Sequence, residues 1–239
     1  MQMTLSVLGL LPWLDWLALL SLFAGWIGYA LFAKRRSPVR RSLLAATNAE
    51  RRRWMLQTTF RENRVIDGVV VQNLSTAPSF FASTTILIIG GLLAVLSATD
   101  RASELVQQMP FAARTSVLVF DLKLLLLTGI FVYAFFRFTW SLRQYGFVAL
   151  LLAAAPDAAQ FEREGSSSRD AFADRAGRVV GLAAETFNDG LRAYYMAFAA
   201  IAWFFSPVAL LVATAGVVWI LYQREFRSEV LAVLEDLPE

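Results

Sequence analysis

The chain has 239 residues, of which 57% are hydrophobic, and its 22 Lys and Arg against 19 Asp and Glu give a formal net charge of +3. This composition, with four long apolar runs, predicts an all-α polytopic membrane protein that forms one membrane domain over residues 1–239. The absence of Cys and His excludes disulfides and metal sites or catalysis that use thiolate or imidazole. We therefore expect no metal, no cofactor and no enzyme activity.

The first apolar run covers residues 13–33. No Lys or Arg precedes it, and Lys34, Arg35 and Arg36 follow it directly. A cleavable signal peptide has the opposite charge pattern, so this run is predicted to be an uncleaved membrane span. By the positive-inside rule we expect the N-terminus outside. The membrane that we expect is the inner (plasma) membrane, which is bacterial if the family resemblance given below holds.

Residues 34–79 carry ten Lys and Arg against three acids, which predicts that this segment is cytoplasmic. Its composition indicates a helix over 48–73 with Asn48 as N-cap, lying near the lipid headgroups. Because the basic residues adjoin a span, we expect membrane lipid and not nucleic acid as their partner. Seven of them are candidates for binding anionic lipid: Arg35, Arg36, Arg40, Arg41, Arg51, Arg52 and Arg53. The alternative is that they only set topology and form a solvated face.

The second span is predicted over 80–98, entered after Pro78. Its small residues Ser83, Gly90, Ala94 and Ser97 share one helical face. Such a face either lines a narrow pore or lets another helix approach closely. The next segment, 99–114, has balanced charge, as expected of an external loop.

The third span, 116–140, contains Asp121, Lys123 and Arg137. At about 100° per residue, Lys123 and Arg137 share a face, while Asp121 points about 200° away from Lys123. Arg137 is expected to snorkel to the cytoplasmic headgroups, and Lys123 either snorkels or faces protein. Asp121 has little reach, so we expect it to find a partner on another helix, on another subunit or at Arg114.

Beyond this span the apolar pattern continues to Pro156, and residues 162–169 are predicted to be a flexible linker. A cytoplasmic helical region is expected over 141–192. Its second part carries polar residues on or beside one face: Asp174, Arg178, Glu185, Asn188, Asp189 and Arg192. This stripe is either the solvated face of an amphipathic helix or the lining of a wet cavity or subunit seam.

The fourth span is predicted over 197–222. Pro207 lies inside it and should free a backbone carbonyl one turn earlier, which a neighbour or water must satisfy. With four spans the tail, 223–239, shares the outer side with the N-terminus. Arg224 and Arg227 argue against that arrangement, so a re-entrant element or another span count stays open.

Three strings resemble the bacterial and plant membrane family called domain of unknown function 599. They are FFASTTILIIGGLLAVL over 80–96, FFRFTWSLRQY over 135–145 and ETFNDGLRAYYMAFA over 185–199. The similarity extends from about Arg61 to Tyr222. It implies a four-helix membrane architecture with no established activity and no catalytic residues.

Two functions are consistent with these features. The first is a homo-oligomeric channel or transporter-like protein for a small ion or solute, because four helices alone enclose little room for a path. The alternative is a membrane scaffold or regulatory protein that binds anionic lipid and a soluble partner. A membrane enzyme is the weakest interpretation, because the acids match no metal motif. The candidate pathway or interface residues are Ser83, Asp121, Lys123, Arg137, Asp174, Arg178, Glu185, Asn188, Asp189 and Arg192.

Overall fold

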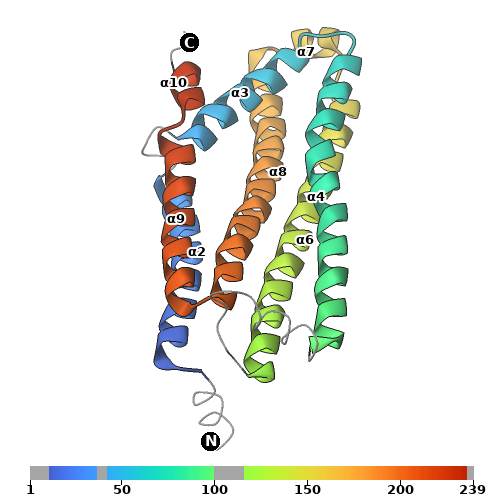
Figure 1. Cartoon of the computed structure of the whole chain (residues 1–239). Helices are drawn as coiled ribbons and strands as arrows, with labels where there is room; N and C mark the ends of the chain where they lie inside the picture. Colours follow the sequence, from blue (N-terminus) through green and yellow to red (C-terminus); the bar gives the residue numbers. More distant parts are fainter. Residues whose placement is uncertain (1–10, 37–41, 100–115, 236–239) are drawn as a thin grey trace, which may run out of the picture. The chain divides into compact units, whose positions relative to one another are not determined.

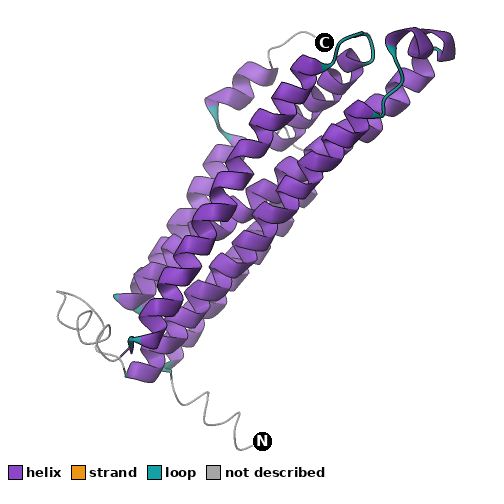
Figure 2. Cartoon of the chain, turned by 90° about the vertical axis from the view of Figure 1, so that its right-hand side faces the viewer, coloured by secondary structure: helices purple, strands orange, loops and turns teal. Residues whose placement is uncertain are grey.

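The computed structural model describes residues 11–36, 42–99 and 116–235, and their regular secondary structure is entirely helical (Figure 2). In chain order the helices are α2 (Trp13–Arg36), α3 (Leu43–Thr58), α4 (Val65–Ser97), α6 (Val117–Ala153), α7 (Ala158–Glu164), α8 (Ser166–Ile201), the 3₁₀ turn η1 (Ala202–Phe204), α9 (Pro207–Phe226) and α10 (Glu229–Glu235).

Four helical segments within the described ranges are long and apolar enough to cross a membrane: Trp13–Arg35, Val65–Ser97, Val117–Ala153 and Pro207–Leu234. The predicted all-α membrane architecture is therefore confirmed. In the most apolar stretch of Val117–Ala153, 44% of the residues are buried. In that of Val65–Ser97, only 11% are buried. Helix α6 is thus the most enclosed of the four, and α4 presents most of its apolar side chains outward, as a lipid-facing helix does.

The chain forms two compact units, and α4, α6 and α8 contribute to both. Among the described elements, unit 1 contains α2 to Arg35, α4 from Thr84, α6 to Ala134, α8 from Leu191, η1, and α9 to Gln223. Unit 2 contains α3, α4 to Ser83, α6 from Phe135, α7, α8 to Gly190, and the chain from Arg224 through α10.

Within unit 1, α2 and α9 lie side by side and run in the same direction (Figure 1). Near their amino ends, the Trp203 indole just before α9 donates to Asp15 of α2, with 2.5 Å between Nε1 and Oδ1. Near their carboxyl ends, the Tyr29 hydroxyl donates to the Leu221 carbonyl at 2.9 Å. Two parallel spans end on the same side of a membrane, so α9 ends on the side where α2 leads into the basic segment.

The last part of α8 carries the chain back through unit 1 before α9 begins. Tyr194 of α8 is 2.7 Å from Thr85 of α4, hydroxyl to hydroxyl, and its ring packs edge-on against Phe131 of α6 with centroids 5.1 Å apart. A tail on the side of the N-terminus therefore does not fit this structure. That expectation assumed one crossing for residues 197–222, whereas α8 and α9 pass through unit 1 in succession.

The predicted span over 197–222 is interrupted, not kinked. Helix α8 ends at Ile201, η1 follows, and Pro207 is the first residue of α9. Proline is favoured at the first helical position, where its missing N–H leaves no bond unmade in its own helix. Ser206 completes the start of α9, since its Oγ accepts from the Ala209 N–H at 3.0 Å.

In unit 2, the predicted helix over 48–73 is two helices. Helix α3 begins earlier than expected, because Ser42 and not Asn48 is its N-cap, accepting from the Ala45 N–H at 3.2 Å. It ends at Thr58, and α4 begins at Val65, so Pro78 lies inside α4 and does not mark its entry. Proline is tolerated inside membrane helices because neighbouring groups satisfy the freed backbone.

The continuation of the third helix beyond its span is confirmed, since α6 ends at Ala153. The flexible linker predicted over 162–169 is wrong. Gly165 has φ of 87°, which joins α7 to α8 in a single residue, and its N–H donates to the Phe161 carbonyl at 3.0 Å. Glycine adopts this backbone conformation without the steric cost of a Cβ. The buried side chains of α3, α4, α6, α7 and α8 form the core of unit 2, including Met55, Val71, Val148, Phe161 and Val180.

The shared direction of α2 and α9 predicts the sidedness of the tail. The chain has no native Cys, so Trp13→Cys, Lys34→Cys and Glu229→Cys are each unique reporters at exposed positions. In right-side-out vesicles, a membrane-impermeant maleimide should label only Trp13→Cys, and after permeabilisation it should label all three. Labelling of Glu229→Cys together with Trp13→Cys before permeabilisation would contradict this arrangement.

Candidate functional site

Lys123 is buried in unit 1, with only 3% of its surface exposed. Its Nζ donates to the Trp203 carbonyl at 2.8 Å. The ammonium lies 5.2 Å from the centroid of the Trp203 ring and 5.8 Å from that of Phe204, within the range of cation–π attraction. Of the two alternatives for Lys123, the structure therefore supports the one in which it faces protein, and snorkelling does not hold.

Pro207 explains why the Trp203 carbonyl is available. In a continuous helix this carbonyl would accept from the N–H four residues later, but residue 207 is proline and has no N–H. The predicted freed carbonyl is thus confirmed, and the neighbour that satisfies it is Lys123 of α6. A charge-assisted hydrogen bond of this kind stabilises by about 1.5–3 kcal/mol.

Asp15 completes this group of side chains. It is 7% exposed and accepts from Trp203 Nε1 at 2.5 Å. One tryptophan thus contacts a cation through its carbonyl and ring, and an anion through its indole N–H. We call Asp15, Lys123, Trp203 and Phe204 the Lys123 cluster. Sequence reasoning missed Asp15, although an acid in the first turn of a span is the kind of residue that needs a partner.

Asp121 is not part of this cluster. It is half-buried, and its Oδ1 is buried without a hydrogen-bond partner among the described residues. Arg114, the intrachain partner that the sequence suggests, lies outside the described residues. The prediction that Asp121 points away from Lys123 in search of a partner stays a prediction.

Arg137, predicted to snorkel, instead forms an ion pair with Asp189 of α8 in unit 2. The two side chains are 31% and 29% exposed, so solvent and salt screen the pair less than a fully exposed pair. Arg137 Nε is buried and has no partner among the described residues. This pairing between helices was not visible from the spacing of charges within either one.

The remaining polar stripe of α8 is divided between the two units. In unit 2, Asp174 pairs with Arg52, and Glu185 accepts from Asn48 Nδ2 at 3.5 Å. Arg178 is exposed and Asn188 is half-buried. In unit 1, the Arg192 guanidinium lies 5.7 Å from the ring centroid of Tyr29. Three acids of the stripe thus bind other helices of unit 2 and are not simply a solvated face.

Helix α4 does not turn its small residues inward. Ser83 in unit 2 is exposed, and so are Gly90, Ala94 and Ser97 in unit 1. Within a single chain this face therefore lines no pore among the described residues. It remains accessible to lipid or to another copy of the chain.

Three arginines of the basic segment that lie on α3 form bonds within unit 2. Arg51 donates to Asn48 Oδ1 at 2.6 Å and to Thr47 Oγ1 at 3.0 Å. Burial lowers the pKa of Arg51, an effect that nearby Tyr145 and Glu185 oppose. Arg52 pairs with Asp170 and Asp174, and Arg53 pairs with Glu50. Lipid binding by these three arginines stays a prediction.

The other predicted lipid-binding residues are nearer to the first span. Arg35 is exposed at the end of α2, as is Lys34 beside it. The side chain of Arg36 and all of Arg40 and Arg41 lie outside the described residues. Arg35 is thus exposed at the end of a span, where lipid headgroups lie.

Asp67 and Arg64 are two charges whose structural roles sequence reasoning missed. Asp67 is fully buried, accepts from Trp54 Nε1 at 2.8 Å and pairs with Arg61. Arg64 donates to the Ala155 carbonyl at 2.8 Å and also to that of Pro156, two residues that follow the carboxyl end of α6. These bonds fix the break between α3 and α4. Within the described ranges, no group of three or more Asp and Glu is placed to hold a metal ion.

The close approach of α8 to Phe138 gives a test of packing in unit 2. A Cβ at Gly190 would lie 2.7 Å from Phe138 Cδ1, and Phe138 is fully buried. Gly190→Ala should destabilise the protein by about 1–3 kcal/mol, seen as a lower midpoint of thermal unfolding in detergent. Gly129→Ala in α6 is the matched control, since a Cβ there would meet nothing within 4 Å. Equal midpoints for the two variants would contradict the packing described.

The model of a family described as "Protein of unknown function, DUF599" matches residues 17–230. No curated protein and no solved structure matches the chain.

Proposed function

The chain belongs to the DUF599 family of membrane proteins of unknown function, and we propose that it conducts or transports a small ion or solute across the membrane as a homo-oligomer. No residue has a catalytic role in this function. The observation that carries it is the buried Lys123 in a membrane span, bound to a backbone carbonyl at the break between α8 and α9.

Charged side chains inside membrane spans are costly and are retained mainly where they meet a transported species or a partner. Broken membrane helices expose backbone carbonyls that coordinate ions in transporters. The Lys123 cluster combines both features, because the break between α8 and α9 exposes the Trp203 carbonyl and Lys123 occupies it. A buried ammonium at that carbonyl can be displaced by a competing cation or can attract an anion. Lys123 and Asp15 both bond to Trp203, so displacement of the ammonium or attraction of an anion can be coupled to the charge of Asp15.

The exposed small residues of α4 support assembly of several copies. A Cβ added at Gly90 or at Gly91 would meet no atom within 4 Å, and the face that Gly90 shares with Ala94 and Ser97 is exposed. Small residues let two membrane helices approach closely. Subunits that meet along α4 would provide the enclosed path that four helices of one chain do not.

Lys123→Met tests this function directly. In proteoliposomes, the wild-type protein should carry potassium or chloride faster than empty vesicles, and Lys123→Met should change that rate about tenfold or more because it removes the buried charge. Arg175→Met, which removes an exposed charge from α8, should leave the rate unchanged.

Asp15→Asn provides a second variant in case Lys123→Met is unstable. It removes the charge but keeps an oxygen that accepts from Trp203, so the fold should persist while flux changes. No flux by the wild-type protein, or equal flux by wild type and both variants, would contradict the proposal.

A scaffold function is the second candidate, and the use of charges in unit 2 favours it. Arg52 with Asp174, Arg137 with Asp189, and Asn48 with Glu185 tie helices together and need no transported species. In that case the basic segment binds anionic lipid and unit 2 binds a soluble protein. The same proteoliposomes separate the two functions, because a scaffold gives no flux above that of empty vesicles.

A further inference from the structure

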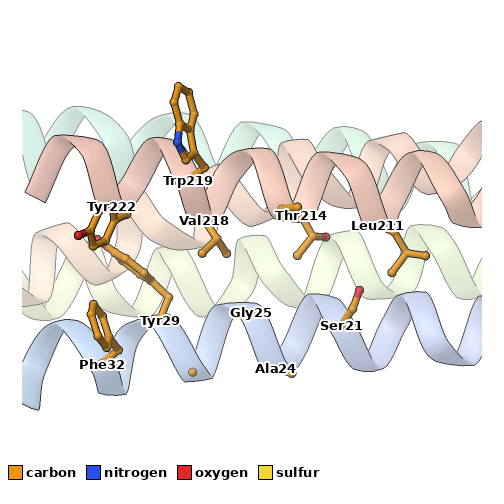
Figure 3. Close-up of a pocket in the computed structure, with 12 residues that line it drawn as sticks. Ser21, Ala24, Gly25, Tyr29, Phe32, Leu211, Thr214, Val218, Trp219 and Tyr222 are labelled. Atoms are coloured by element: carbon orange, nitrogen blue, oxygen red, sulfur yellow. The ribbon is translucent and has the colours of Figure 1, made fainter.

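An apolar groove of about 760 Å³ lies within unit 1, between α2 and α9 (Figure 3). Its lining comes only from these two helices, both of which are apolar enough to cross a membrane. The volume falls within the range of about 300–1,000 Å³ that is usual for small-molecule sites. Since both helices are candidate membrane spans, we expect hydrocarbon and not water around the groove.

Two glycines shape the groove. A Cβ at Gly25 would lie 3.1 Å from Thr214 Cγ2, so the absence of a side chain there lets α2 approach α9. A Cβ at Gly28, one turn further along, would meet no atom within 4 Å. The two helices therefore approach closely at Gly25 and leave open space at Gly28. The close-up shows the labelled Gly25 on α2 opposite Thr214 and Val218 of α9 (Figure 3).

Three hydroxyl groups that line the groove are already bonded to backbone carbonyls. Ser21 donates to Ala18 at 2.8 Å, Thr214 to Leu210 at 2.8 Å, and Tyr29 to Leu221 at 2.9 Å. A ligand with hydrogen-bond acceptors would have to break these bonds to gain its own. The lining thus favours a hydrocarbon chain.

The length and ends of the groove identify the kind of hydrocarbon. From Ser21 to Phe32 the lining extends along α2 for about 16 Å, at 1.5 Å per residue. That is close to half of the hydrocarbon core of a bilayer, about 30 Å thick, so the groove matches one leaflet. Arg35 is exposed and lies three residues beyond Phe32, close to the face of α2 that lines the groove. Lys34 is also exposed but lies about 200° around the helix from Phe32.

We propose that this groove binds one acyl chain of an anionic phospholipid, whose phosphate is held by Arg35. The chain lies over Gly28, and the headgroup lies at the membrane face where α2 ends. This site does not depend on the transport function, and it gives the predicted lipid-binding residue Arg35 a specific geometry. A cation at the end of an apolar groove complements a ligand that joins a phosphate to a hydrocarbon tail.

The test is native mass spectrometry of delipidated protein, titrated with dioleoyl phosphatidylglycerol or with dioleoyl phosphatidylcholine. Wild type should retain phosphatidylglycerol at least tenfold more tightly. Gly28→Leu fills the groove and should weaken binding of both lipids. Arg35→Gln should abolish the preference for phosphatidylglycerol but leave binding of phosphatidylcholine unchanged, whereas Lys34→Gln, on the other face of α2, should keep that preference.

Gly91→Leu in α4 is the matched control, because Gly91 is also exposed and a Cβ there would meet nothing within 4 Å. It should bind both lipids as wild type does. Equal lipid binding by Gly28→Leu and Gly91→Leu would overturn the proposal. So would a change from dimer to monomer in Gly28→Leu with unaltered lipid binding, because the groove would then hold a second copy of the chain.

Discussion

The hydrogen bond from Lys123 to the Trp203 carbonyl is the interaction on which unit 1 depends. Pro207 removes the N–H that would otherwise bind this carbonyl within a helix, and inside a membrane there is no water to replace it. Lys123 supplies the donor, and Trp203 then holds Asp15 through its indole. Because Pro207 has no N–H, the Trp203 carbonyl bonds to Lys123 of α6, and the Trp203 indole bonds to Asp15 of α2. The break before α9 is thereby held to both helices, with α9 parallel to α2.

Charges serve a different purpose in unit 2. Its basic residues form ion pairs and hydrogen bonds that join helices. Arg52 pairs with Asp174 of α8, Arg137 pairs with Asp189 of α8, and Arg64 donates to the Ala155 carbonyl just after α6. Residues whose charge predicts a topology thus also hold a folded polar unit together. In unit 1, by contrast, the cations Lys34 and Arg35 stay exposed where α2 ends.

The features that the sequence predicted are those that depend on local properties. Four long apolar helices follow from hydropathy, the freed carbonyl follows from Pro207, and the extension of α6 follows from its apolar pattern. The features that it missed depend on partners distant in the chain. Arg64 separates α3 from α4 by binding a carbonyl just after α6, and nothing in the pattern around Asn48 reveals that bond. Likewise, Lys123 could be placed on a face of its helix, but its acceptor is 80 residues away.

A double-mutant cycle between Lys123→Met and Pro207→Ala tests the central interaction most directly, by thermal unfolding in detergent. In the wild-type background, Lys123→Met orphans a buried carbonyl and should cost about 1–3 kcal/mol. Alanine at residue 207 restores an N–H that can bind this carbonyl, so Lys123→Met should cost much less in the Pro207→Ala background. Additive effects of the two substitutions would show that Pro207 and Lys123 do not act on the same carbonyl.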